Sequence, residues 1–232
     1  SSNNWEMKFI GLESNSLSSI GEGNILRNSI KRTYEKINIQ DFDISSLPNV
    51  PYGKYKVVID PGHGGSDPGA VGINGLRETD IVLEVSKNIT EFLSKKGVQT
   101  ILTRSDERTL DLQPRVTKAN NFKADAFVSI HANATRGKRK DVNGLETYYY
   151  SGFKGQSLAK NIHKQILISS YQSPDRGVKR SRFYVIRKSS MPAALVEIGF
   201  VTGNYDAALL RQKAYRDKMS FAIAKGILNW KP

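Results

Sequence analysis

The sequence predicts an α/β fold, in which a mostly parallel, twisted sheet is covered by helices on both faces within a single domain. Short runs of apolar and β-branched residues alternate along the chain with longer segments of helical periodicity, which is typical of parallel strands joined by helices. About 180 of the 232 residues follow position 53, and this length suffices for one hydrophobic core. These observations favour one principal domain.

The chain divides at residue 53. Residues 1–53 are rich in Ser, Asn and Gly, contain one helix candidate at Ile25–Ile37, and end in the linker-like sequence SSLPNVPYGK. We interpret residues 1–53 as an N-terminal extension or linker without chemistry of its own, and residues 54–232 as the folded domain.

Strand and helix patterns alternate along this domain. In its first half we predict the strand KVVID, a helix at Asp80–Lys96, the strand VQTILTR, a helix at Leu112–Phe122 and the strand DAFVSIHAN. In its second half we predict the strand GLETYYY, a helix near Gln156–Ser170, strands at Phe183–Ile186 and Ala193–Glu197, and a closing helix at Ala214–Asn229.

Two of the three histidines lie where an apolar run gives way to a loop, namely His63 in KVVIDPGHGG and His131 in DAFVSIHAN. Glu197 lies in a similar run, AALVEIGFV. The carboxyl ends of strands in open α/β sheets form ligand crevices, so these three side chains are expected to share one pocket. Glu78 opens the next helix, and the five glycines between positions 64 and 75 allow the loop to fold it back to the same end.

Two imidazoles and one carboxylate form a ligand set that suits a catalytic zinc ion with one open coordination position. Zinc acidifies water to a pKa near 7, so that it becomes a nucleophile, and a further carboxylate can accept its proton. We assign that role to Glu197, because a carboxylate among apolar residues is costly to bury without a charged partner. The implied chemistry is hydrolysis of an amide or ester.

Each residue also has a simpler interpretation. A histidine at a strand end is often just hydrogen-bonded or solvated. A glutamate in the first turn of a helix, like Glu78, is favoured by the helix dipole without any metal. His163 falls within a helical pattern beside two lysines, and we interpret it as a helix-surface or flanking residue and not as a ligand.

Five motifs in order, VVIDPGHGGSDPGA, RETD, SIHAN, GLETYYY and PAALVEIGFVT, resemble the zinc-dependent N-acetylmuramoyl-L-alanine amidases of the amidase type 3 family. The resemblance runs from Lys54 to Trp230 and marks residues 54–232 as a catalytic domain. It implies that Zn²⁺ is the cofactor, that peptidoglycan is the substrate, and that the bond cut joins the lactyl group of N-acetylmuramic acid to L-alanine.

Carried over position by position, the resemblance makes His63, Glu78 and His131 the zinc ligands and Glu197 the catalytic glutamate. Arg187 matches an arginine of the family pattern, which implies that it binds a carboxylate of the stem peptide through paired hydrogen bonds. A solvated or structural arginine is the alternative.

The chain is strongly basic, with a net charge of +13. A basic surface attracts polyanions, which include the bacterial wall, membrane headgroups and nucleic acid. The runs RGKRK and RGVKRSR can be interpreted as nucleic-acid patches, as solvated loops or as the rim of the site. A nucleic-acid-binding protein leaves Glu197 and the two histidines unexplained, so we predict no nucleic-acid partner.

Zero cysteines are compatible with an oxidising compartment, and no apolar stretch reaches the roughly 18–20 residues of a membrane span. A signal peptide is absent at Ser1, so the polar start favours a fragment or processed form of an exported protein, with a wall-targeting domain upstream. We expect action in the periplasm or cell wall of a bacterium during wall remodelling or cell separation. The sequence does not identify an activator protein.

Two related functions stay open at this point. A zinc peptidase could cut between amino acids of the stem peptide with the same metal site. A non-catalytic wall-binding module could keep the fold, although such a module has no need of the proton acceptor Glu197.

Overall fold

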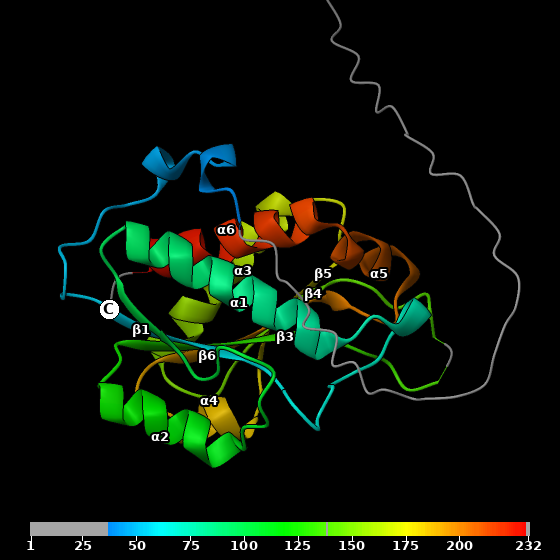
Figure 1. Ribbon diagram of the computed structural model, residues 1–232, viewed down its shortest axis with the longest axis horizontal. Helices are drawn as coiled ribbons and strands as arrows, with labels where there is room; N and C mark the ends of the chain where they lie inside the picture. Colours follow the sequence, from blue (N-terminus) through cyan, green and yellow to red (C-terminus); the bar gives the residue numbers. More distant parts are fainter. Residues whose placement is uncertain (1–36, 138, 231–232) are drawn as a thin grey trace, which may run out of the picture. The chain divides into compact units, whose positions relative to one another are not determined.

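The computed structural model describes residues 37–137 and 139–230 and contains a six-stranded sheet (Figure 1). The strands are β1 (Lys56–Pro61), β2 (Gln99–Leu102), β3 (Ala126–Asn133), β4 (Leu145–Tyr149), β5 (Asp175–Arg180) and β6 (Ala193–Phe200). The helices are α1 (Glu78–Lys95), α2 (Leu112–Phe122), α3 (Phe153–Ser169), α4 (Tyr184–Lys188), α5 (Asn204–Arg211) and α6 (Lys213–Asn229), and short 3-10 helices cover Ile39–Asp41, Ile44–Ser46 and Ile73–Gly75.

The strand order is β2-β1-β3-β6-β4-β5. The four strands β2, β1, β3 and β6 are mutually parallel, whereas β4 runs antiparallel to β6 and parallel to β5. The sheet is therefore mostly parallel, as predicted. Helices cover both faces: α1, α3 and α6 lie on one side of the sheet in Figure 1, and α2 and α4 lie on the other.

The two faces have separate apolar cores. Val57 and Ile59 of β1 contribute to the core under α1, α3 and α6, whereas Val58 contributes to the core under α2 and α4. Burial on both faces explains why these strands are continuous apolar runs with no polar alternation. On β3 and β6, Phe127 and Leu195 belong to the α2/α4 side, so side chains at odd positions, including 131 and 197, point to that side.

Three predictions of local structure were wrong or incomplete. The segment predicted as a strand at Phe183–Ile186 forms most of helix α4, because both edges of β6 are already paired and Val185 and Ile186 instead pack on the α2/α4 core. Strand β5 and helix α5 were not predicted. The sequence of β5, DRGVKR, is almost wholly polar because it is an exposed edge strand.

His163 is buried, so its interpretation as a helix-surface residue was wrong. Its Nδ1 lies 2.9 Å from the Thr147 hydroxyl and its Nε2 lies 2.9 Å from a carboxylate oxygen of Asp175. The side chain therefore ties α3 to β4 and β5 and takes no part in the group of metal-type donors described below.

The segment before β1 contributes to the core. Ile37 and Leu47 are buried among its apolar residues, although they belong to the stretch predicted to be an extension. The predicted helix at Ile25–Ile37 falls, apart from its last residue, outside the described residues. The boundary at residue 53 stays a prediction.

Two buried arginines hold the chain where β1 ends. Arg104, which is 1% exposed, donates to the carbonyls of Pro61 and Gly62 at 3.1 and 2.6 Å. Arg115, on α2, donates to the carbonyls of Pro61 and His63 at 2.6 and 2.7 Å. The three consecutive carbonyls of the turn thus receive charge-assisted hydrogen bonds, which are stronger than those from neutral donors.

Arg115 also pairs with the buried carboxylate of Asp60 at 3.0 Å. Thr103 and Ser129 donate to the same carboxylate at 2.5 and 2.7 Å, so Asp60 links β1 to the end of β2 and to β3.

We expect Arg115→Met to lower the free energy of unfolding by about 3–5 kcal/mol, because it leaves a buried carboxylate without its cation. Urea denaturation followed by circular dichroism measures this change. Lys164→Met, which removes one charge from an exposed position of α3, serves as the control. A loss at Arg115 no larger than in this control would contradict the role of the ion pair.

Candidate metal centre

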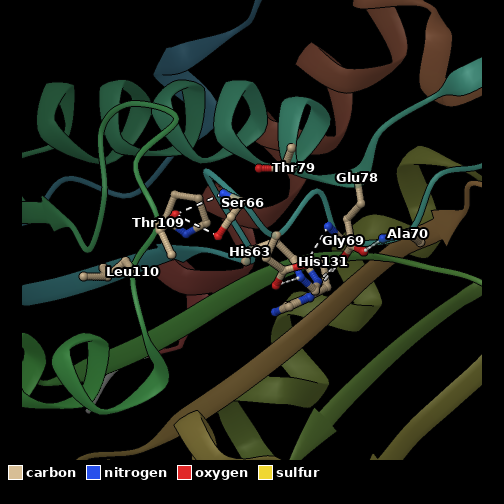
Figure 2. A network of polar contacts seen from close by, with 12 residues as sticks. His63, Ser66, Gly69, Ala70, Glu78, Thr79, Thr109, Leu110 and His131 are labelled. Carbon is tan, nitrogen blue, oxygen red and sulfur yellow. Dashed lines mark hydrogen bonds and ion pairs between the residues drawn. The ribbon is translucent and has the colours of Figure 1, made fainter.

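Three side chains that are distant in sequence meet above the carboxyl end of β3. His63 follows β1, Glu78 is the first residue of α1, and His131 lies in β3. One carboxylate oxygen of Glu78, Oε1, lies 3.2 Å from Nε2 of His63 and 3.0 Å from Nδ1 of His131 (Figure 2). One donor atom from each residue lies within 4.8 Å of the others, so together they form a compact set of potential ligands.

Two glycines of the loop between β1 and α1 leave the space that the ligand side chains occupy. A Cβ atom on Gly62 would collide with the imidazole ring of His131, so that ring occupies the space of a missing side chain. A Cβ atom on Gly69 would lie 2.6 Å from Oε2 of Glu78, and Gly69 also has a φ of +63°, which favours glycine. Close packing of the three ligands thus depends on glycine at both positions.

His63 and Glu78 are each held by further contacts. Nδ1 of His63 lies 2.7 Å from the carboxylate of Asp67, which turns Nε2 toward Glu78. The backbone amides of Ala70 and Ala132 donate to the two oxygens of Glu78 at 2.9 and 3.0 Å. A carboxylate behind a histidine is a common arrangement in metal sites, because it fixes the tautomer and the orientation of the ring.

Electrostatics favour a cation at this position. Burial alone would raise the pKa of Glu78, but the hydrogen bonds with His131 and His63 outweigh it and hold that pKa far below the usual value. Burial would lower the pKa of His63, yet its contacts with Glu78 and Asp67 raise it. The carboxylates therefore create a site in which positive charge is stabilised.

Glu197 is the fourth member of the site. In the sheet it is the register partner of His131, and it is buried on the same face. Its Oε2 atom is buried without a hydrogen-bond partner among the described residues. Burial raises the pKa of Glu197 well above its usual value, and the charges of Glu78 and Glu146 raise it further.

The residues fit a zinc ion. Ligands in a tetrahedral zinc site with bonds of about 2.0–2.1 Å lie about 3.3 Å apart, close to the two nitrogen–oxygen separations at Glu78. Two imidazoles and one carboxylate are a common catalytic set, which leaves a position open. The buried, unpartnered oxygen of Glu197 suits a group that handles a proton beside that position.

A cavity of about 200 Å³ adjoins the two histidines. Its other walls come from Thr109 and Leu110, from Leu112 at the start of α2, and from Val185 of α4. A substrate group therefore has room beside the ligands.

The structure separates Arg187 from this group. Arg187 lies on α4 and lines a different cavity of about 380 Å³, with Tyr150, Met191 and Pro192. Its guanidinium lies over the ring of Tyr184, 5.9 Å from the centroid. Its role as a substrate ligand stays a prediction.

Two residues that support the site were not singled out in the sequence. Asp67 lies within the motif that contains His63, four positions after it, and this spacing was the available signal. Glu146 lies in GLETYYY and is the register partner of Glu197 in the antiparallel pair of β4 and β6. The available signal for Glu146 was a charged residue within a predicted strand.

Comparison with known proteins agrees with this geometry. Residues 57–229 match a family model described as N-acetylmuramoyl-L-alanine amidase. The chain is 47% identical over 174 residues to the uncharacterized protein YqiI of Bacillus subtilis, covering 74% of the chain and 82% of YqiI. It is 42% identical over 177 residues to the N-acetylmuramoyl-L-alanine amidase LytC of Bacillus subtilis, covering 75% of the chain but only 35% of LytC.

A solved structure, the amidase AmiC2 of Nostoc punctiforme, superimposes with a TM-score of 0.74 at 47% sequence identity, covering 77% of this chain and 98% of that one. The chain belongs to the N-acetylmuramoyl-L-alanine amidase family. The family assignment and the α/β fold predicted from the sequence are thus both confirmed.

None of the amidase helices within the described residues is long and apolar enough to cross a membrane.

We expect Asp67→Ala in this amidase to lower zinc affinity by roughly 10–100-fold, because the imidazole of His63 loses the group that orients it. Competition with a chromophoric chelator measures the affinity. Asp141→Ala removes an exposed carboxylate from a loop and serves as the control. Equal zinc affinity in the Asp67 variant and the control would show that Asp67 does not orient the ligand.

Proposed function

We propose that the chain is a zinc-dependent peptidoglycan hydrolase that cleaves the amide bond between the lactyl group of N-acetylmuramic acid and L-alanine of the stem peptide. His63, Glu78 and His131 are its zinc ligands, and Glu197 is its catalytic residue. Family membership supports the activity. The observation that carries the mechanism is the buried carboxylate of Glu197, in register with His131 beside three metal-type donors.

Zinc, when bound there, supplies Lewis acidity that polarises a carbonyl and acidifies water. Glu197 accepts the proton of the attacking water, because its buried carboxylate has an oxygen available for that proton. It then passes the proton to the leaving nitrogen. The amide and one water thus become a lactyl carboxylic acid and a free amino group on alanine.

The protein also sets the direction of proton transfer. Burial raises the pKa of the Glu197 carboxyl, which makes its carboxylate a stronger base, and the acid that it becomes donates the proton to the leaving nitrogen as the carbon–nitrogen bond breaks. Glu78 cannot take this role, because both of its oxygens are already hydrogen-bonded and its pKa is lowered.

We infer that the protein acts outside the cytoplasm, in the periplasm or cell wall, during wall remodelling or cell separation. The net charge of +13 supports this inference, because it attracts the protein to the anionic wall. A wall-targeting domain upstream would localise the activity. Arg187 would contact a more distant carboxylate of the substrate, because it lines a cavity of its own.

Digestion of purified peptidoglycan tests this proposal. We expect wild-type protein to release stem peptides that begin with L-alanine, as identified by mass spectrometry. A chelator should abolish release and added zinc should restore it. Cuts inside the peptide would identify a peptidase, and no release with zinc bound would identify a wall-binding module.

We expect Glu197→Ala to bind zinc with unchanged stoichiometry but to lose nearly all turnover, because the variant keeps the three ligands and lacks the proton acceptor. Metal analysis of the dialysed protein and the rate of peptide release measure the two properties. Turnover equal to wild type would rule out Glu197 as the base.

A further inference from the structure

Glu146 is a buried carboxylate with an unusual number of donors. It is 3% exposed and receives hydrogen bonds from Arg176 at 2.5 Å, Lys179 at 2.9 Å, Asn133 at 3.0 Å and Tyr148 at 2.5 Å. Both cations come from the edge strand β5 and reach back over β4. In the mechanism proposed above Glu146 acts only through its charge on Glu197, and its four donors have no role.

This cluster lies beside the reaction centre. Glu146 is the register partner of Glu197, which in turn is the register partner of His131, so the three side chains form a row across one face of the sheet. Neighbouring strands lie about 4.8 Å apart. Because the nitrogens of Arg176 and Lys179 contact Glu146 from the side of β5, they lie between one and two strand spacings from Glu197.

Glu146 neutralises only one of the two positive charges of Arg176 and Lys179. Two positive charges meet one carboxylate, and both bonds go to the same oxygen, Oε1. The side chains of Arg176 and Lys179 are 36% and 43% exposed, so each presents donors to the surface. Arg176 donates to Glu146 through Nε, and its planar guanidinium carries further N–H groups that suit a second carboxylate.

Aromatic side chains border the cluster. The ring of Tyr148 meets that of Phe183 edge to face, with centroids 5.1 Å apart, and Arg176 lies over the ring of Phe200 at 5.1 Å. The contacts with Phe200 and Glu146 limit the movement of Arg176, and the contact with Glu146 limits that of Lys179. An ordered pair of cations loses less conformational entropy when it binds a ligand.

We propose that Arg176 and Lys179, held in place by Glu146, form a subsite for a carboxylate of the peptide near the scissile amide. The amidase therefore favours stem peptides in which this carboxylate is free over those in which it is amidated. The inference rests on the proposed function and specifies its substrate. Glu146 is a positioning residue, and the cations determine specificity.

Charge and length decide which part of the substrate lies here. The peptide carries carboxylates, whereas N-acetylated sugars are neutral, so the peptide side of the amide points toward β4 and β5. An extended residue spans about 3.3–3.6 Å. A carboxylate on the second residue after the scissile bond, about 7 Å along an extended chain, thus reaches the cations, which lie between one and two strand spacings from Glu197.

The competing explanation is that the cluster only attaches the edge strand to the sheet. That role would affect folding but not discrimination between a carboxylate and its amide. The experiment therefore compares two peptidoglycan preparations that differ only in whether the second stem residue carries a free carboxylate or a carboxamide. The measured quantity is the ratio of kcat/KM for the two substrates with the full chain.

We expect wild type to favour the free carboxylate by roughly 10-fold or more, the effect of a hydrogen bond to a charged group. In Lys179→Gln and Arg176→Gln this ratio should fall toward one. Lys179→Arg, which keeps the charge, should retain the preference. Lys164→Gln removes the same charge from α3, on the opposite face of the sheet, and is the matched control.

Each outcome decides between the ideas. Turnover of neither substrate by zinc-loaded wild type would contradict the proposed function itself. Turnover of both at equal kcat/KM would leave that function intact and overturn the subsite. A preference that survives in Lys179→Gln and Arg176→Gln but is lost in Arg187→Gln would assign carboxylate recognition to α4. Thermal unfolding of every variant separates loss of specificity from loss of fold.

Discussion

The turn at the end of β1 depends on two buried guanidinium groups, and the proposed metal centre depends on that turn. Arg104 and Arg115 donate to the carbonyls of Pro61, Gly62 and His63, three consecutive acceptors. Buried backbone carbonyls without partners are costly. The arginines satisfy them with donors of fixed geometry, so the chain can leave the sheet abruptly and present His63 over the end of β3.

Carboxylates dominate the centre itself. Glu78, Glu197 and Glu146 lie close together, and each has a different environment. Glu78 is surrounded by donors, Glu146 by cations and a tyrosine, and Glu197 by apolar groups and by the other two acids. These environments separate their chemical roles: the first suits a metal ligand, the second organises cations, and the third suits a proton acceptor.

Local sequence patterns were sufficient to predict much of this arrangement. His63, His131 and Glu197 interrupt or end apolar runs, and such positions converge when the strands are parallel. The supporting residues were harder to predict, because Arg104, Arg115 and Asp67 act through contacts between loops, strands and helices that leave no periodic pattern. Helix α4 was mistaken for a strand because four apolar or aromatic residues fit either structure, and only the occupied edges of β6 decide between them. Strand β5 has no apolar pattern, because it lies exposed at the edge of the sheet and is held there by backbone hydrogen bonds and polar contacts.

The polarity of β5 has a consequence for the protein in solution. An edge strand presents unpaired backbone groups that can recruit a strand from another molecule, and charged side chains along such an edge discourage this pairing. Asp175, Arg176, Lys179 and Arg180 all lie on β5, which ends the sheet. The charges of β5, two of which form the proposed carboxylate subsite, thus also protect the protein against aggregation.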